Sequence, residues 1–470
     1  MSFLVPRALF AAVLLIPAAA QPAVPGRVGR IQVSANGRFL EYTDRTPFFW
    51  QGDTAWRLFD RLTREEVTRY LDDRQAKGFN VIQAVALHAR VLQPPYGAPL
   101  LDNDPLRPNV TPGSDPGKPG EYDYWDHVDW IVGQAAKRGI YIAMLPCWGN
   151  VVNTGMLNAE TGPRYVRWLA QRYGSRPNIF WVLGGDTRGD RNGDVWRAMG
   201  RALKEADPVH LISYHPFGRT QSSQWFHNEP WLDFNMFQSG HRRYDQDTDP
   251  GAKGEDNWRY VAEEYALSPA KPTLDAEPSY ENIPQGLHDT TQPYWSDAHV
   301  RRYAYWSVFA GACGHTYGDN AIQQMYQPGT AGAFGPRNYW FEAIHDPGSG
   351  QMQYLKRLML SRPYFERVPA QDVLASPNGA RYDYIAVTRG RGYLFAYTFT
   401  GAPIAIRLGI LSGKRVHAWW YSPRDGTARD AGTFANTGTR TFSPPQHSEE
   451  ERDWVLVIDD ASQHYPAPGR

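Results

Sequence analysis

The sequence of 470 residues has very little cysteine: Cys147 and Cys313 are the only two. A chain with one possible disulfide is not a disulfide-built scaffold, and without CxxC or histidine-rich spacing it lacks the signature of a zinc site. Both cysteines stand in apolar segments. We predict two free, buried thiols, although an exported protein could pair them, and we expect neither a metal nor an organic cofactor.

The chain also has a formal net charge of zero, because 49 basic residues balance 49 acidic ones. No basic field is therefore available to attract nucleic acid or an anionic membrane. The apolar run 8–16 is too short to span a bilayer, but it follows Arg7 and precedes the small residues 17–20. This pattern predicts a signal peptide over residues 1–20 and a soluble protein exported to the periplasm or the extracellular space. We also expect a monomer.

Aromatic residues, in contrast, are abundant, with 17 Trp and 27 Tyr and an aromatic content of 14%. Aromatic rings stack on the apolar faces of sugars, so this excess is typical of carbohydrate-active proteins. Tryptophan also fills ordinary cores, and composition alone leaves both interpretations open.

From Pro47 onward, short apolar runs alternate with helical patterns, which indicates βα units and a parallel sheet. A hairpin at 31–42, with its turn at Asn36-Gly37, precedes them. We predict a (β/α)8 TIM barrel over residues 30–366. Its eight strands are expected at 48–50, 81–86, 141–145, 179–183, 211–214, 234–237, 273–275 and 313–317.

After Arg367 the pattern changes to short alternating strands separated by turn signals such as Pro377-Asn378-Gly379. This is typical of a small antiparallel β-sandwich, which we predict over residues 367–462. Its strands are expected at 384–388, 393–398, 404–408, 416–421 and 454–458.

Two acids follow barrel strands, where catalytic side chains of such barrels project. Asp186 comes after the fourth strand and two glycines, and Glu277 comes after the seventh strand and before Pro278. Glycoside hydrolysis commonly uses two carboxyl groups across the scissile bond. Asp186 could instead cap the next helix, and Asp275 competes with Glu277 because an extended strand would point both to the same side.

Polar or aromatic residues follow the other strands as well, and we predict that they bind the substrate. Any one of them is more often structural, but such residues at all eight strand ends favour a site at this rim. The candidates are Asp53, Trp56, His88, Trp148, His215, Gln238, Tyr317 and Asp319.

Residues 33–365 resemble the apiosidase-like catalytic domain of glycoside hydrolase family 140. The resemblance rests on the segments 49–56 (FWQGDTAW), 77–82 (KGFNVI), 178–186 (NIFWVLGGD), 274–278 (LDAEP) and 314–318 (GHTYG). The C-terminal stretch resembles a β-sandwich that often accompanies such barrels and is named for collagen binding. Segments 419–426 (WWYSPRDG) and 453–456 (DWVL) carry that likeness.

The resemblance implies a retaining enzyme that cleaves an apiose-containing linkage of rhamnogalacturonan II. Asp186 would be its acid/base and Glu277 its nucleophile. Another furanosidase or a pyranosidase on the same barrel, and a non-catalytic carbohydrate- or matrix-binding protein, are the alternatives.

Overall fold

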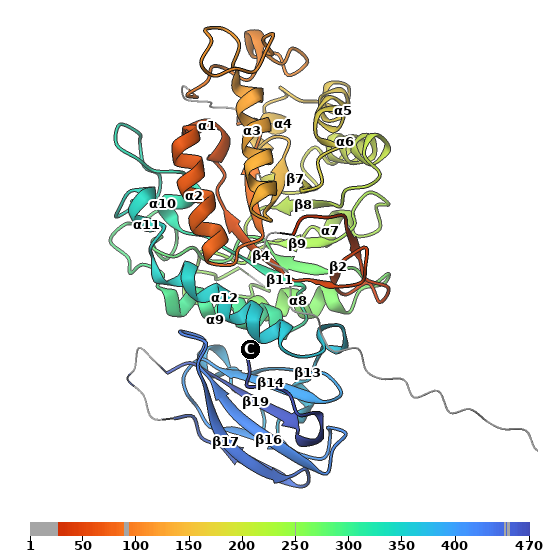
Figure 1. Ribbon diagram of the computed structural model, residues 1–470, viewed down its shortest axis with the longest axis vertical. Helices are drawn as coiled ribbons and strands as arrows, with labels where there is room; N and C mark the ends of the chain where they lie inside the picture. Colours follow the sequence, from red (N-terminus) through yellow and green to blue (C-terminus); the bar gives the residue numbers. More distant parts are fainter. Residues whose placement is uncertain (1–26, 89–93, 250, 446–447, 449–451) are drawn as a thin grey trace, which may run out of the picture.

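The computed structural model describes residues 27–88, 94–249, 251–445, 448 and 452–470. Two bodies lie end to end along the long axis, a barrel with its helices and a smaller all-β body (Figure 1). The predicted signal peptide, residues 1–20, lies outside the described residues.

The chain opens with a small antiparallel sheet made of β1 (Ile31–Val33), β2 (Leu40–Tyr42) and β3 (Pro47–Phe48). Gly37 takes a left-handed φ of 69° in the predicted hairpin turn between β1 and β2. Apolar side chains of this sheet pack against the inside of the barrel, so the sheet closes the barrel's amino-terminal end.

The predicted TIM barrel is present. Its parallel strands are arranged in the order β8-β7-β6-β5-β4-β11-β10-β9, and the Asp233 amide donates to Ile212 across the remaining gap. The strands are β4 (Trp50–Thr54), β5 (Val81–Val85), β6 (Tyr141–Leu145), β7 (Ile179–Thr187), β8 (Ile212–Pro216), β9 (Asn235–Phe237), β10 (Thr273–Asp275) and β11 (Gly314–Tyr317).

The predicted first strand, 48–50, was wrong in its bounds. Phe48 belongs to β3, and the barrel strand runs from Trp50 to Thr54. Sequence patterning missed this because Gln51 and Asp53 are polar. Both are nevertheless buried on the outer side of the strand, where Gln51 Nε2 donates to the Lys77 carbonyl and Asp53 Oδ2 accepts from Arg74 Nε.

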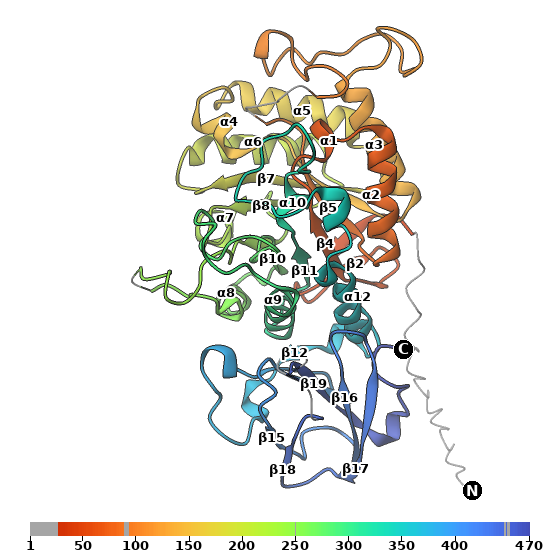
Figure 2. The ribbon, with the colours of Figure 1, turned by 90° about the vertical axis from the view of Figure 1, so that its left-hand side faces the viewer.

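Helices surround the barrel (Figures 1 and 2), and local sequence features mark the ends of two of them. Thr63 and Glu66 form a capping box at the start of α2, and Gly139 with a φ of 72° follows α3. The helices are α1 (Leu58–Arg61), α2 (Arg64–Ala76), α3 (Tyr124–Lys137), α4 (Gly149–Asn153), α5 (Thr161–Tyr173), α6 (Gly193–Ala206), α7 (Ser223–Phe226), α8 (Asn257–Tyr265), α9 (Asp297–Phe309), α10 (Asn320–Gln323), α11 (Trp340–Ala343) and α12 (Pro347–Leu360).

The C-terminal body is the predicted β-sandwich. One antiparallel sheet has the order β12-β13-β14-β19-β16-β17, and β15 pairs with β18. Its strands are β12 (Val368–Pro369), β13 (Ala386–Arg389), β14 (Tyr393–Thr398), β15 (Ile404–Arg407), β16 (Arg415–Tyr421), β17 (Ala428–Ala435), β18 (Thr439–Phe442) and β19 (Trp454–Asp460). The sequence did not predict β12, β17 or β18, because β12 has only two residues and the other two strands are mostly exposed and lack apolar alternation.

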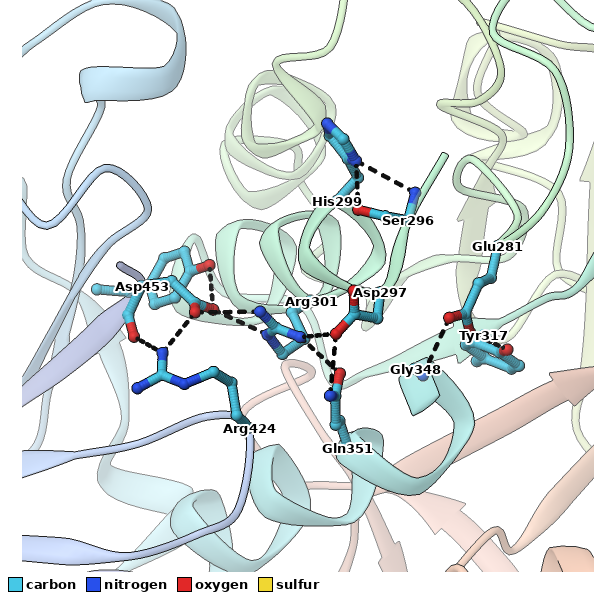
Figure 3. A network of polar contacts seen from close by, with 11 residues as sticks. Glu281, Ser296, Asp297, His299, Arg301, Tyr317, Gly348, Gln351, Arg424 and Asp453 are labelled. Atoms are coloured by element: carbon cyan, nitrogen blue, oxygen red, sulfur yellow. Dashed lines mark hydrogen bonds and ion pairs between the residues drawn. The ribbon is translucent and has the colours of Figure 1, made fainter. Parts of the chain in front are cut away.

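Helices α9 and α12 of the barrel rest on the sandwich (Figure 2). One apolar cluster contains side chains of both bodies, including the stacked rings of Tyr305 and Tyr397. Arg301 of α9 donates from Nε to the Asp453 carboxylate at 2.9 Å, and both side chains are buried (Figure 3). The two bodies therefore share a core and a buried ion pair.

The two cysteines are free and buried, as predicted. Burial raises the pKa of both thiols, to about 12 for Cys313. Over the part of the chain that the structure describes, no helix has the length and hydrophobicity that a membrane span requires.

Candidate active site

Asp186 lies at the carboxyl end of β7 after a turn that requires two glycines. Gly184 and Gly185 take φ values of 90° and 95°, and Asp186 itself has a φ of 46°. A Cβ on Gly184 would overlap the His215 carbonyl oxygen, and one on Gly185 would lie 2.7 Å from the Trp148 ring. The turn leaves the Asp186 side chain exposed to solvent, and it does not cap α6, which begins after Asn192.

Glu277 lies two residues beyond β10 and is buried. Its Oε1 accepts a hydrogen bond from His241 Nε2 at 3.0 Å, and its Oε2 lies 3.2 Å from His215 Nε2. Asp186, His215, His241 and Glu277 form what we call the carboxylate–histidine cluster. Its members come from the ends of four consecutive strands, β7 to β10.

The two carboxyl groups of this cluster lie close together. Asp186, His215 and Glu277 each contribute one oxygen or nitrogen, and these atoms lie within 4.8 Å of one another. Carboxyl separations of about 5–5.5 Å accompany retention at the anomeric carbon, and separations of about 6.5–9.5 Å accompany inversion. An oxygen of Asp186 and an oxygen of Glu277 approach within 4.8 Å, which agrees with the shorter of these two ranges.

The environments of the two carboxyl groups push their pKa values apart. Loss of hydration among the surrounding protein atoms, together with the negative charge of Glu277, raises the pKa of Asp186 to about 7. Burial alone would also raise the pKa of Glu277, but the two histidines outweigh it and lower that pKa to about 2. At neutral pH one acid can hold a proton while its neighbour is ionised, the combination that acid and nucleophile roles require.

Asp275, the competitor of Glu277, lies outside the cluster. Its Oδ2 accepts hydrogen bonds from Ser239 Oγ at 2.7 Å and from Asn257 Nδ2 at 2.9 Å. Leu274 and Ala276 on either side pack inside the barrel, so Asp275 points outward to the helices. Strand β10 ends at Asp275, which is why the two acids do not share a side.

Four of the predicted binding residues lie beside the cluster, namely Trp56, His88, Trp148 and Gln238. Trp56 contacts Trp148 and His215 edge to face, with ring centroids 5.1 Å apart in both pairs. His88 stacks on Trp148 at 5.7 Å, and burial lowers the pKa of His88 to about 3. Gln238 is near Asp186 and lowers the pKa of its carboxyl group.

Asp53 lies elsewhere, and its predicted contact with a sugar hydroxyl does not fit its position. The side chain is fully buried on the outer side of β4, where Oδ2 accepts from Tyr70 at 2.6 Å and from Arg74 Nε at 2.5 Å. Asp53 balances a fully buried arginine between strand and helix α2.

Tyr317 and Asp319 also point away from the cluster. The Tyr317 hydroxyl donates to Glu281 at 2.5 Å in the outer layer, beside α12 (Figure 3). Asp319 caps α10, accepting from the amides of Ala321 and Ile322. Both side chains are buried and already bonded, so their predicted role in substrate binding does not fit this structure.

His241 and Tyr280 are the residues of the site that the sequence did not single out for it. His241 stands in the motif Gln238-Ser-Gly-His241 after the sixth strand, a visible signal. Tyr280 packs its ring 4.7 Å from His241. Burial raises the pKa of Tyr280 well above its usual value, and the charges of Glu277 and Asp186 add to this shift.

Asp186, His215 and Glu277 form the one group among the described residues in which three side chains of metal-binding type come close enough for an ion. Two carboxylates and an imidazole would suit a divalent cation. The same three atoms also match the acid, nucleophile and hydrogen-bond donor of a metal-independent glycosidase.

Comparison with known proteins agrees with this geometry. Residues 34–366 match the family model described as "Apiosidase-like, catalytic domain", and residues 368–459 match "Putative collagen-binding domain of a collagenase". A search of curated proteins gave no match.

Two solved structures are similar over nearly the whole chain. One is named a glycoside hydrolase, with 45% identity and a TM-score of 0.88, over 93% of this chain and 98% of the other. The second is a family 5 glycoside hydrolase from Bacteroides vulgatus ATCC 8482, with 43% identity and a TM-score of 0.87, over 93% and 94%. From its fold, its family model and these relatives, the chain is a glycoside hydrolase that belongs to the apiosidase-like family.

Proposed function

We propose that the protein is a retaining glycosidase in which Asp186 is the acid/base and Glu277 the nucleophile. The observation that carries this assignment is the carboxylate–histidine cluster, in which the two acids are close and have opposite pKa shifts. We also take residues 30–366 as the catalytic domain and 367–462 as the sandwich, behind a signal peptide at 1–20.

In the first step, a Glu277 oxygen attacks the anomeric carbon while Asp186 transfers its proton to the glycosidic oxygen. The glycosidic bond breaks, the leaving alcohol departs, and a glycosyl ester on Glu277 remains. In the second step, Asp186, now ionised, removes a proton from water, and that water displaces Glu277. Two inversions restore the original anomeric configuration.

The surrounding residues suit these roles. His241 donates to Glu277 and His215 Nε2 lies 3.2 Å from its other oxygen, which keeps Glu277 ionised before attack and stabilises it when it leaves the sugar. The pKa of about 7 lets Asp186 arrive protonated and then act as a base. Trp56, Trp148 and His88 lie beside the cluster and offer rings for the substrate to stack against.

For the substrate, we propose a plant cell-wall polysaccharide, with apiose linkages of the pectin rhamnogalacturonan II as the leading candidate. Membership of the apiosidase-like family supports this choice. An exported, monomeric enzyme acting in the periplasm or outside the cell would meet such a substrate. Another furanoside, such as an arabinofuranoside, or a pyranoside is the alternative within the same chemistry.

A panel of pectic and hemicellulosic glycans tests substrate and mechanism together. Free apiose released from rhamnogalacturonan II is the expected product, and release of another sugar from another glycan would reassign the substrate. NMR of the first product formed should show the anomeric configuration of the substrate. An inverted product would overturn the retaining mechanism, and binding without turnover across the panel would overturn catalysis.

A further inference from the structure

The loop between β9 and α8 connects the active site to the C-terminal sandwich. His241, near the start of this loop, donates to Glu277. Three residues later, the Tyr244 amide donates to Glu255 Oε1 at 3.3 Å, within the same loop. The backbone that carries His241 is therefore bonded to the Glu255 carboxylate.

Glu255 is fully buried, and its other bonds come from two different bodies. Oε2 pairs with Arg302 of α9 at 2.5 Å, and Oε1 also accepts from the Tyr382 hydroxyl of the sandwich at 2.7 Å. A buried carboxylate depends on such partners because each unmade bond leaves it without the water it has lost. The sandwich thus supplies part of the site that holds Glu255 in place.

Aromatic rings of both bodies surround Arg302, the ion-pair partner of Glu255. The Arg302 guanidinium lies over Tyr303 and Trp306 of the barrel, at 4.8 and 5.0 Å, and over Tyr382 and Phe399 of the sandwich, at 4.8 and 5.2 Å. The Tyr382 ring also contacts Tyr244 at 5.6 Å. Both members of the ion pair are therefore fixed across the domain boundary.

We propose that Glu255 is a positioning residue that fixes the loop carrying His241, and that Tyr382 of the sandwich completes its site. The C-terminal domain is then part of the active-site scaffold and not only an attached binding module. This inference rests on the proposed role of Glu277. On its other side, the His241 carbonyl accepts from the Gly286 amide and Trp295 Nε1, so Glu255 clamps the free side of the loop.

Tyr382→Phe tests the proposal with little disturbance, because it removes one hydroxyl and leaves the Glu255–Arg302 pair intact. Tyr397→Phe is the matched control. The Tyr397 hydroxyl donates to Asp453 at 3.2 Å, and Asp453 pairs with Arg301, the neighbour of Arg302 on α9. Both variants lose a hydroxyl from a buried ion pair at the same interface, but Tyr397 does not contact the His241 loop.

The first measurement needs no substrate. Crystal structures of the two variants are compared at the His241 Nε2 to Glu277 Oε1 contact, which is 3.0 Å here. Tyr382→Phe should lengthen it or split His241 into two positions, and Tyr397→Phe should leave it unchanged. An unchanged contact in Tyr382→Phe, or an equal change in both variants, would overturn the proposal.

The second measurement is the pH dependence of kcat/KM on whichever glycan of the panel is cleaved. The groups that face Glu277 are His215, His241, Asp186 and Tyr280. A weaker His241 bond should move the acidic limb to higher pH and lower kcat/KM roughly threefold to tenfold, the range of one hydrogen bond. Tyr397→Phe should keep the acidic limb of the wild-type pH profile. If the acidic limb lay at the same pH in both variants, the positioning role of Glu255 would be wrong.

The two proposals fail in different ways. If Glu277→Gln stays active, the assignment of the nucleophile is wrong, whatever the tyrosine variants do. If Glu277→Gln is inactive while Tyr382→Phe keeps both the contact and the acidic limb, only the positioning role is wrong.

Discussion

Polar residues near the strand ends fall into two regions that differ in what their neighbours do. The carboxylate–histidine cluster faces the axis at the open end of the barrel, with Asp186 exposed. The outer polar layer, which we define as Asp53, Asp275, Glu281, Tyr317 and Asp319, lies between strands and helices. All of its members are buried and bonded to protein groups.

A polar residue at a strand end therefore does not by itself predict a site residue, because the face of the strand on which it lies must also be known. Successive side chains on a strand point to opposite faces, so of two neighbouring residues one points to the barrel axis and the other to the surrounding helices. On β11, Thr316 contacts Trp50 inside the barrel, while Tyr317 points outward to Glu281. A raised pKa does not separate the regions either, because burial raises the pKa of Asp275 to about 7 as well. What distinguishes Asp186 is its exposed position beside an ionised partner.

The largest effect should come from Glu277→Gln. Removing the proposed nucleophile should lower kcat on the order of 10⁴-fold or more, as nucleophile removal does in other enzymes. Circular dichroism and thermal unfolding should show a folded protein. Asp275→Asn is the paired variant from the outer polar layer. If it alone abolished turnover, the choice between the two acids would be reversed.

Asp186→Asn should lower kcat/KM by about 10²- to 10⁴-fold, the usual contribution of a general acid. The proposed mechanism requires the protonated form of Asp186, so kcat/KM of the wild type should fall as pH rises through about 7, the pKa of Asp186. That alkaline limb should disappear in the variant. A pH profile that keeps the limb would assign it to another group.

Asp53→Asn should act on stability and not on catalysis. The change leaves the guanidinium of Arg74 buried without its counter-charge, and breaking such a pair costs about 3–5 kcal/mol. Chemical denaturation should reveal the loss, while kcat/KM of the folded variant stays near the wild type. A large rise in KM in the folded variant would return Asp53 to the substrate site.

The smallest effect should come from Tyr317→Phe. It removes one buried hydrogen bond to Glu281 and should lower the free energy of unfolding by about 1 kcal/mol. Its kcat/KM should match the wild type. A clear loss of activity without a loss of stability would contradict the division between the two regions.

Much of this protein was determined by its sequence alone. Apolar runs of the right length predicted seven of the eight barrel strands within a few residues, because a parallel strand that is buried on both faces is mostly apolar. Gly184-Gly185-Asp186 and Glu277-Pro278 indicated the two acids, because glycine and proline at the end of an apolar run predict a sharp turn there. Capping at Thr63 and the turn at Gly37 were equally local.

Only the tertiary structure decided the rest. The side chains of Asp53, Tyr317 and Asp275 lie on the outer face of their strands. The buried charge of Asp53 is neutralised by Arg74, which is distant in the sequence. The same folding brought His241 to Glu277 and placed Tyr382 of the sandwich on Glu255. These contacts join residues 36 and 127 positions apart, and no local pattern records them, because distance along the chain carries no information about which side chains meet.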